Sequence, residues 1–210
     1  ATIASWNPHA RFTRCPPRVR VSAFGRPGDA DMFTGIITAV GRIAQVEPLG
    51  SASAHGRRLS VETPAGWLGD TQLGDSIAIN GACMTVVALA PGGRGFSVDV
   101  SAESLARTAG LDQPGPVNLE QSLRAHDKLG GHLVSGHVDG VGRVTHFAPV
   151  GESWELRILA PRELGRFLAR KGSVAVSGVS LTVNRVDDLP EGCEFSINLI
   201  PHTVVQTNLH

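Results

Sequence analysis

A glycine-rich segment near the middle of the chain, GGHLVSGHVDG over residues 130–140, concentrates groups that could do acid–base or metal chemistry. It holds His132, His137 and Asp139. If the segment is extended, the two histidines point to opposite faces and do not readily bind one ion, so we disfavour a metal site. Ser135, His137 and Asp139 share a face by the same rule. For His137, an acid–base role and a structural role at a strand end both remain open.

Two further segments, NGACMTV and SGVSLTV, carry thiol and hydroxyl groups at matching positions. Cys83 and Thr85 lie in the first segment, and Ser180 and Thr182 lie in the second. Each pair is spaced to share one strand face. A thiol could act as a nucleophile or a polar contact, but free cysteine is most often a small buried hydrophobe, so a core position for Cys83 is the alternative. Because one copy has Cys where the other has Ser, the two sites cannot do identical work.

Other familiar chemistries have no motif support. The chain contains no phosphate-binding P-loop, no GxGxxG between strand and helix, no GxSxG elbow and no HExxH. Cys15, Cys83 and Cys193 form neither a CxxC pair nor an even disulfide set. The 19 basic and 19 acidic residues balance, so we expect neither a nucleic-acid partner nor an anionic membrane partner. No apolar run approaches the roughly 18–20 residues of a membrane span.

The elements that position these groups are revealed by an internal repeat. FTGIITAVGRI at residues 33–43 aligns with VSGHVDGVGRV at 134–144. GDSIAINGACMTV at 74–86 aligns with KGSVAVSGVSLTV at 171–183. FSVDVSAESL at 96–105 aligns with FSINLIPHTV at 195–204. Three blocks in the same order, at offsets of 97 to 101, indicate a duplicated domain of roughly 100 residues.

Each copy reads as a set of short strands. SIAIN, CMTVV and FSVDV alternate with the period of a strand, as do SVAVS, SLTVN and FSINL, and the 25 Gly and 13 Pro supply turns. Helical stretches are brief, such as residues 161–170. Five or six strands per copy predict two small closed barrels in tandem. VNLE at residues 117–120 reads as a further strand, and its equivalent would begin just after Leu209. We therefore expect the second barrel to be incomplete at its C-terminus, or else to be closed by another segment.

The first 31 residues differ from the rest. They hold five arginines and no acidic residue before Asp29, and they have no sustained period, so we expect disorder. They could be a transit peptide, or residues upstream of a true start at Met32. We therefore expect a cytoplasmic protein, or one of the plastid stroma if this segment is a transit peptide.

The blocks MFTGII, GDSIAINGACMTV, GGHLVSGHVDGVG, KGSVAVSGVSLTVN and INLIPHTVVQTNL, in this order over residues 32–209, resemble riboflavin synthases of the alpha-chain type. The resemblance implies an all-β chain of two tandem six-stranded Greek-key barrels, at residues 32–130 and 131–210. The last strand and the trimerisation helix of that family would lie beyond His210. It also implies a dismutation in which one 6,7-dimethyl-8-ribityllumazine donates a four-carbon unit to another. The site would form between barrels of neighbouring chains in a homotrimer, without metal or organic cofactor.

The same resemblance implies the site residues. His137 is the candidate acid–base group, Thr182 its hydroxyl partner, Cys83 a nucleophile or polar contact, and Ser180 the counterpart of Cys83. Contacts to the ring and the ribityl chain would come from Phe33, Thr34, Gly35, Ile36, Ile37, Ser76, Met84, Thr85, Asp99, Val100, Ser101, Ala102, Glu103, Ser104, Gly136, Val138, Lys171, Leu181, Asn198, Leu199, Ile200, Pro201, His202 and Thr203. Hydroxyl, amide and backbone groups of this kind suit a neutral polyol and a uracil-like edge.

A non-catalytic relative is the alternative function. Lumazine proteins share the duplicated barrels and bind one lumazine or flavin as an optical antenna. Those relatives tend to lose the cysteine and the GHV segment, whereas this chain has both, at Cys83 and at residues 136–138. A generic interaction module of two barrels is the more distant alternative, disfavoured because polar groups recur on equivalent faces of both copies.

Overall fold

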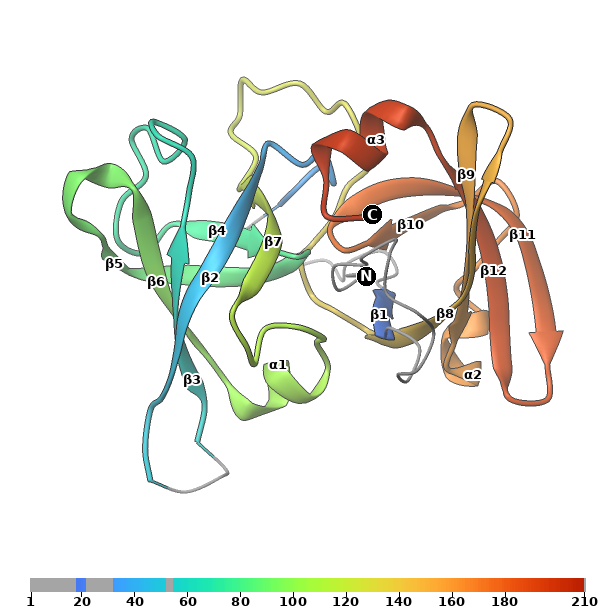
Figure 1. The fold of residues 1–210 in the computed structure, drawn as a ribbon, viewed down its shortest axis with the longest axis horizontal. Helices are drawn as coiled ribbons and strands as arrows, with labels where there is room; N and C mark the ends of the chain where they lie inside the picture. The colour runs from blue at the N-terminus through green and yellow to red at the C-terminus, as the bar shows by residue number, and fades with distance from the viewer. Residues whose placement is uncertain (1–17, 22–31, 52–54, 210) are drawn as a thin grey trace.

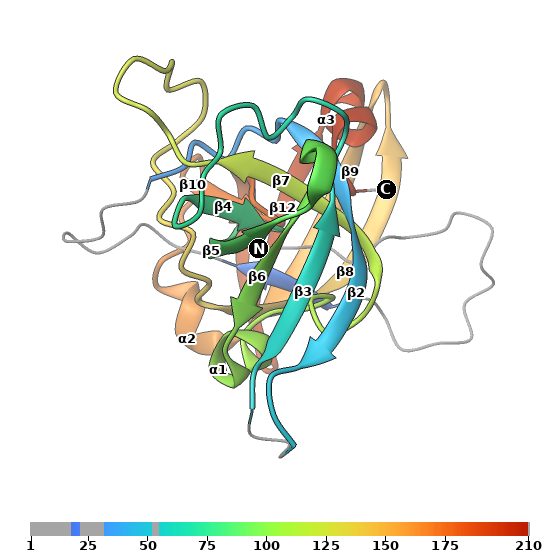
Figure 2. The same ribbon diagram turned by 90° about the vertical axis from the view of Figure 1, so that its left-hand side faces the viewer.

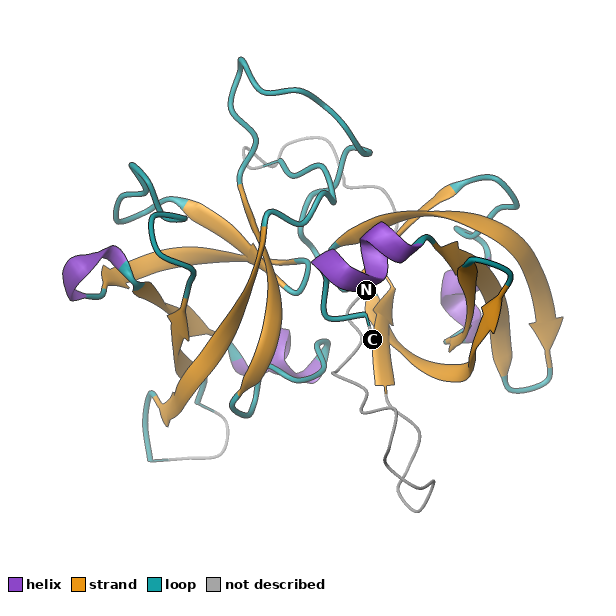
Figure 3. Cartoon of the chain, turned by 45° about the horizontal axis from the view of Figure 1, so that its top comes forward, coloured by secondary structure: helices purple, strands orange, loops and turns teal. Residues whose placement is uncertain are grey.

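Two barrel-like β units stand side by side in this computed structural model, which describes residues 18–21, 32–51 and 55–209 (Figure 1). Strands account for about half of the described chain, and the helices are short (Figure 3). The prediction of an all-β protein with duplicated barrels is confirmed, although only the first six-stranded sheet closes on itself and the second remains an open half-barrel. Among the described residues no helix is long and apolar enough to cross a membrane.

The first unit is a closed barrel, seen facing the viewer in Figure 2. Its strands are β2 (Ala39–Pro48), β3 (Arg57–Glu62), β4 (Ser76–Ile79), β5 (Ala82–Leu89), β6 (Gly95–Val100) and β7 (Gly115–Gln121), paired in the order β2-β3-β6-β5-β4-β7. A 3-10 turn, η1 (Pro91–Gly93), and a short helix, α1 (Ala102–Ala106), flank β6. The segment VNLE is part of β7, as its sequence predicts.

The second unit repeats this arrangement in its own five strands, which are β8 (Gly140–Val150), β9 (Ser153–Ala160), β10 (Ser173–Val176), β11 (Val179–Leu189) and β12 (Gly192–Leu199). The short helices are α2 (Arg162–Gly165) and α3 (Pro201–Gln206). Helix α2 covers only part of the predicted stretch 161–170. Helices α1 and α3 follow equivalent strands, β6 and β12, so the repeat in the sequence is a repeat in space.

A strand from the N-terminal extension adds to the β8 edge of the second sheet, whose order is β1-β8-β9-β12-β11-β10. Strand β1 (Arg18–Val21) pairs antiparallel with β8, from Arg18 opposite Arg143 to Val21 opposite Gly140. In the first barrel, β7 pairs with the equivalent part of β2 in the same way. For these four residues the structure differs from the expected disorder, and the rest of residues 1–31 lies outside the described chain. The physical reason is the unpaired edge of β8, which a short strand of alternating Val and Arg can pair with.

Alternating side chains fill each unit from within. The first core includes Ile43, Leu59, Ile77, Phe96 and Leu119, all fully buried. Equivalent strands supply the second core, with Leu156, Ile158, Val183, Phe195 and Ile197 among its members. The opposite face of each strand therefore remains available for polar groups.

The two units meet at matched turns. Asn80 and Gly81 join β4 to β5, and Ser177 and Gly178 join β10 to β11. All four have positive φ, which is 79° at each glycine. A Cβ placed on Gly81 would lie 2.6 Å from the backbone nitrogen of Gly178, so the turns touch backbone to backbone.

A buried amide network joins the same region. Asn118 of β7 donates from its side chain to the carbonyl of Ser177 (3.0 Å). Its side-chain oxygen accepts the backbone N–H of Asn208 (2.7 Å), and the Asn208 side chain donates to Asn80 (3.1 Å). Because unbonded buried amides are costly, this network fixes one orientation of the two units.

Candidate functional site

Cys83, Thr85, Ser180 and Thr182 occupy equivalent positions at the starts of β5 and β11. Thr85 pairs with Ser76 of β4, and Thr182 pairs with Ser173 of β10. In both strands the cysteine or serine is half-buried and the threonine is exposed. The intervening residue points into the barrel. The polar groups therefore lie on the outer face of each barrel, as the alternation predicts.

Each unit receives on this face the segment that leads into the other unit. The carbonyl of Gly35 accepts the N–H of Ser180 (2.8 Å), and the carbonyl of Gly136 accepts the N–H of Cys83 (2.8 Å). Between these contacts, Phe33 and Val134 pair as a β-bridge. The exchange is symmetrical. The segment around Gly35, which leads into the first barrel, completes the Ser180 face, and the segment around Gly136, which leads into the second, completes the Cys83 face.

Both glycines are required by the close approach. Gly35 and Gly136 have φ of 73° and 76°, where L side chains are strained. A Cβ would lie 2.5 Å from Cβ of Ser180 in the first case and 2.6 Å from Cβ of Cys83 in the second. Glycine at these two positions lets the backbone of each segment lie directly against Ser180 or Cys83.

The two faces differ in the residue directly after the glycine. His137 comes after Gly136 on the Cys83 face, is exposed, and its N–H donates to Ser135 Oγ (3.3 Å). Ile36 comes after Gly35 on the Ser180 face and is 47% exposed. The position directly after the glycine therefore carries a titratable residue on the Cys83 face and an aliphatic residue on the Ser180 face.

His132, the other histidine of residues 130–140, lies on the Ser180 face. His132 Nδ1 and Ser180 Oγ are hydrogen-bonded, and both residues are half-buried. The backbone N–H of His132 also donates to the carbonyl of Thr34 (2.9 Å). The strand-parity argument separates His132 from His137 but does not find this partner, because Ser180 lies far away in the sequence.

A chain of amides extends across the second face. Lys171 Nζ donates to Asn184 Oδ1 (3.3 Å), and Asn184 Nδ2 donates to Asn198 Oδ1 (3.3 Å). Asn198 Nδ2 in turn donates to Ser153 Oγ (3.3 Å). Lys171 and Asn198 are predicted site residues, whereas Asn184 and Ser153 are additions from the structure. The chain offers donors and acceptors to a neutral polar ligand.

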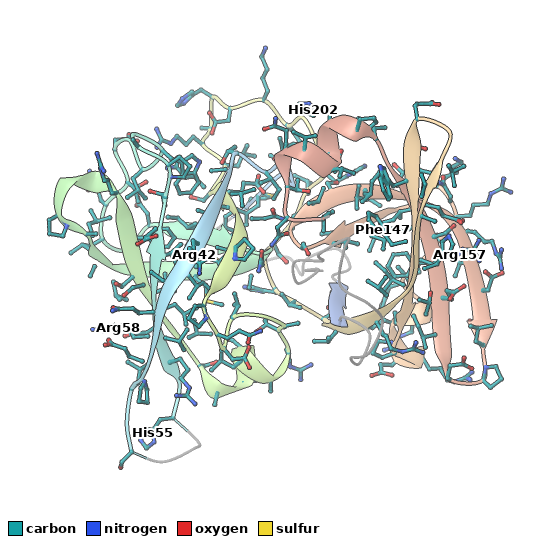
Figure 4. The ribbon with its side chains drawn as sticks, viewed as in Figure 1. Arg42, His55, Arg58, Phe147, Arg157 and His202 are labelled. Carbon is teal, nitrogen blue, oxygen red and sulfur yellow. The ribbon has the colours of Figure 1, made fainter. Side chains whose placement is uncertain are left out.

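On the first barrel, Asp99 is engaged in an ion pair. Both carboxylate oxygens bind Arg58 of β3, at 2.7 and 2.8 Å. Figure 4 shows Arg58 at the outer side of the barrel. The hydrogen bonds and charge of Arg58 hold the pKa of Asp99 below its ordinary value. Nearby, Ser101 caps α1 by accepting the N–H of Ser104 (3.0 Å) and donates its hydroxyl to Ser104 Oγ (2.9 Å).

The remaining predicted residues divide by burial. Five have fully or nearly buried side chains that face the cores, so only their backbone groups can meet a ligand: Phe33, Met84, Val100, Leu181 and Leu199. Ile37 and Val138 pack at the rims of the second and first cores, respectively. Ala102 and Glu103 lie on α1, and Pro201, His202 and Thr203 lie on α3 after exposed Ile200. Figure 4 shows His202 at the top of the second unit.

Among the described residues, neither the cavities nor the arrangement of possible metal ligands indicates a second candidate site. Within the described residues, a cavity of about 700 Å³ between the α1–β7 connection and β8–β9 contains none of the predicted residues. A smaller one of about 180 Å³ includes Ser76. No three His, Cys, Asp or Glu side chains of the described chain gather where they could hold a metal ion. Cys193 is buried, and burial raises the pKa of its thiol.

Comparison with known proteins agrees with this arrangement. The family model described as the lumazine binding domain matches the chain twice, over residues 34–122 and 135–210. The fold also resembles the crystal structure of LumP complexed with riboflavin, with a TM-score of 0.72, 22% identity, and coverage of 84% of this chain and 91% of that one. LumP complexed with 6,7-dimethyl-8-(1'-D-ribityl) lumazine gives a TM-score of 0.68 at the same identity and coverage. Two tandem lumazine-binding domains are therefore the class that the fold and the repeat define.

Curated relatives narrow the class further. The riboflavin synthase of Actinobacillus pleuropneumoniae is 40% identical over 180 residues, which cover 85% of this chain and 79% of the relative. The riboflavin synthase of Photobacterium phosphoreum is 43% identical with 85% and 78% coverage, and that of Brucella abortus is 42% identical with 84% and 85% coverage. The chain belongs to the riboflavin synthase family, and its activity is that of a transferase in riboflavin biosynthesis.

Proposed function

We propose that the two outer faces, one with Cys83 and one with Ser180, each bind one of the two lumazine rings of a single reaction. A reaction that joins two copies of one molecule needs two similar binding surfaces, and the duplicated domain supplies them. One 6,7-dimethyl-8-ribityllumazine donates a four-carbon unit to the other, which yields riboflavin and 5-amino-6-(D-ribitylamino)uracil. The observation that carries this proposal is the symmetrical exchange of Gly35 and Gly136 between the faces.

The chemistry needs three things from the protein. The 7-methyl group of the lumazine is acidic because its anion is delocalised over the ring, so a modest base is sufficient, and His137 is the group for this. A nucleophile or hydroxide donor must act at C7, and the two rings must be held face to face. Ser180 can supply an oxygen nucleophile, because its Oγ is hydrogen-bonded to His132 Nδ1, which accepts the proton in the tautomer that is protonated at Nε2. Cys83 is the counterpart on the other face, as nucleophile or polar contact.

Thr182 is the hydroxyl that relays or orients the proton handled by His137. Within one chain these residues belong to different units, since His137 accompanies the Cys83 face and Thr182 follows Ser180 in β11. The family resemblance implies that a constellation that includes both forms between the first barrel of one chain and the second barrel of another. We propose that three chains assemble into a homotrimer in which the first barrel of each chain meets the second barrel of a neighbour.

Direct conversion tests the activity. Purified protein supplied with the lumazine alone, without added metal or cofactor, is expected to release one riboflavin for every two lumazines consumed, measured by chromatography. Tight lumazine binding without turnover in the assembled protein would instead indicate a non-catalytic chromophore-binding protein.

Mixing of inactive variants tests the shared site. His137→Ala and Thr182→Ala each remove one partner, so each protein alone is expected to be nearly inactive. Co-assembly of equal amounts places an intact first barrel beside an intact second barrel at about one quarter of the interfaces, by random pairing. Partial recovery of activity is the expected result, and no recovery despite mixed assembly would contradict a site shared between chains.

A further inference from the structure

A buried carboxylate of the first barrel, Glu120, lies close to the Ser180 face but is not part of the chemistry described above. It is 5% exposed and lies in β7, paired with Ala78 of β4. Its Oε1 accepts both the N–H and the hydroxyl of Thr34, each at 2.6 Å, and its Oε2 accepts the N–H of Gly35 at 3.0 Å. A buried carboxylate is costly unless it is hydrogen-bonded, and here all three donors come from one dipeptide.

The dipeptide held in this way carries both members of the His132–Ser180 pair. The carbonyl of Thr34 accepts the N–H of His132 (2.9 Å), and the carbonyl of Gly35 accepts the N–H of Ser180 (2.8 Å). The two side chains then bond to each other through Nδ1 and Oγ. Glu120 therefore accepts the N–H groups of residues 34–35, while His132 and Ser180 donate their own N–H groups to the carbonyls of the same two residues.

The backbone of residues 34–35 is packed tightly against the segments that carry His132 and Ser180. A Cβ placed on Gly131 would clash with the Thr34 carbonyl oxygen, and one on Gly35 would lie 2.7 Å from the Ser180 nitrogen. Thr34 Oγ1 also accepts the N–H of Ile36 (3.1 Å), which fixes the turn that follows. In such dense packing a displacement of Thr34 and Gly35 is transmitted to His132 and Ser180 instead of being absorbed.

We propose that Glu120 is a positioning residue for the second barrel's site: by clamping Thr34 and Gly35 from the first barrel, it sets the relative placement of His132 and Ser180. This assignment rests on the proposed role of Ser180. Burial raises the pKa of the Glu120 carboxyl, although the hydrogen bonds from Thr34 and Gly35 oppose the shift. A misplacement of reacting groups by about 1 Å can cost up to a hundredfold in rate, so a residue that touches no substrate can still control turnover.

The test compares Glu120→Gln with Glu62→Gln, an exposed position at the end of β3 in the same barrel. The amide of Glu120→Gln turns a donor toward a backbone N–H, so kcat is expected to fall about tenfold or more. KM is expected to change little, because the ligand contacts remain. Glu62→Gln is expected to retain wild-type kcat and KM. Equal kcat in Glu120→Gln and the wild type would overturn the proposal.

A spectroscopic measurement separates this proposal from the proposed function. The imidazole ¹⁵N resonances of His132, assigned with a His132→Gln variant, report its bond to Ser180 without any turnover. They are expected to shift in Glu120→Gln and to stay unchanged in Glu62→Gln. If the wild type fails to make riboflavin but these shifts occur, only the proposed function fails. Unchanged resonances in a folded Glu120→Gln protein would refute the clamp.

If Glu120→Gln does not fold, Thr34→Val provides the second test. It removes the hydroxyl donor while the two backbone donors to Glu120 remain, so the expected change is in the same direction and smaller. Thr34→Ser keeps the hydroxyl, so its His132 resonances should lie closer to those of the wild type. Identical His132 resonances in Thr34→Val and Thr34→Ser would contradict the proposal.

Discussion

The two barrels are built alike but are equipped differently. Cys83 in the first corresponds to Ser180 in the second, and His137 beside the former corresponds to Ile36 beside the latter. The difference extends to the outer strand face, where charged Asp99 corresponds to neutral Asn198. Duplication has thus kept the positions and changed the side chains. The comparison teaches that equivalent positions can carry different groups: the first face has a thiol and the exposed His137, and the second has a hydroxyl that is hydrogen-bonded to His132.

The largest expected effect comes from removing the His137 imidazole from the Cys83 face. His137→Ala is expected to lower kcat by a factor of roughly 10²–10⁴, the range for removal of a general acid or base. Lumazine affinity should change much less. Steady-state kinetics and equilibrium binding measure the two effects. Ile36→Ala at the equivalent position removes no titratable group, and a comparable fall in kcat there would break the asymmetry.

Exchange of the thiol and the hydroxyl tests the same asymmetry more finely. Cys83→Ser makes both faces carry a hydroxyl and is expected to lower kcat by about tenfold, since a thiol is the stronger nucleophile and the softer contact. The double variant Cys83→Ser with Ser180→Cys should not restore the rate, because His137 stays with the first face. A double variant as active as the wild type would show that the two faces are interchangeable.

The contact between the units predicts an effect on stability. Gly81→Ala must place a Cβ against the backbone of Gly178, at a φ of 79°, and is expected to cost about 2–4 kcal/mol in overpacking and strain. Gly66→Ala has the same φ but meets nothing within 4 Å, so it should cost only about 1–2 kcal/mol. Urea midpoints of the two variants measure the difference. Equal midpoints would contradict the backbone contact between the turns.

The smallest expected effect is a pH dependence that comes from Glu120 of the first barrel. Burial raises the pKa of this carboxyl in the folded state, so the folded protein binds its proton more tightly than the unfolded chain does. Between the ordinary carboxyl pKa and the raised one, the wild type therefore loses stability as pH rises. Glu120→Gln does not titrate, so the wild-type free energy of unfolding should fall relative to that of the variant across this window. A relative rise with pH in urea titrations would contradict the shift.

Much of the fold follows from the sequence because its signals are local or repeated. Strict alternation around Cys83 and Ser180 predicts which side chains face outward, and the structure places Met84 and Leu181 in the cores between outward neighbours. The near-constant offset between repeats predicts two units of the same design, because equivalent sequences form equivalent strands. The same offset also places the candidate groups at corresponding points of the two faces.

The contacts that define the second face could not be predicted in this way. His132 meets Ser180, and Glu120 meets Thr34, across long stretches of chain with no shared periodicity. Burial of Glu120 is also contrary to its residue type, which is seldom buried without partners. The pairing of β1 with β8 depends on an open sheet edge that only the folded protein presents. Tertiary geometry decides these features, and a single sequence contains no direct signal for it.

The exchange of the segments around Gly35 and Gly136 between the two units imposes an order on folding during synthesis. All strands of the first barrel have been made once β7 is complete, but the segment around Gly35 has its partner in Ser180, near the other end of the described chain. Contacts between such distant positions form late, because a long loop must close first. Until β11 emerges, the nascent protein therefore lacks both the partner of Gly35 and the second core against which Ile37 packs, and this interval is when the chain most needs protection from aggregation.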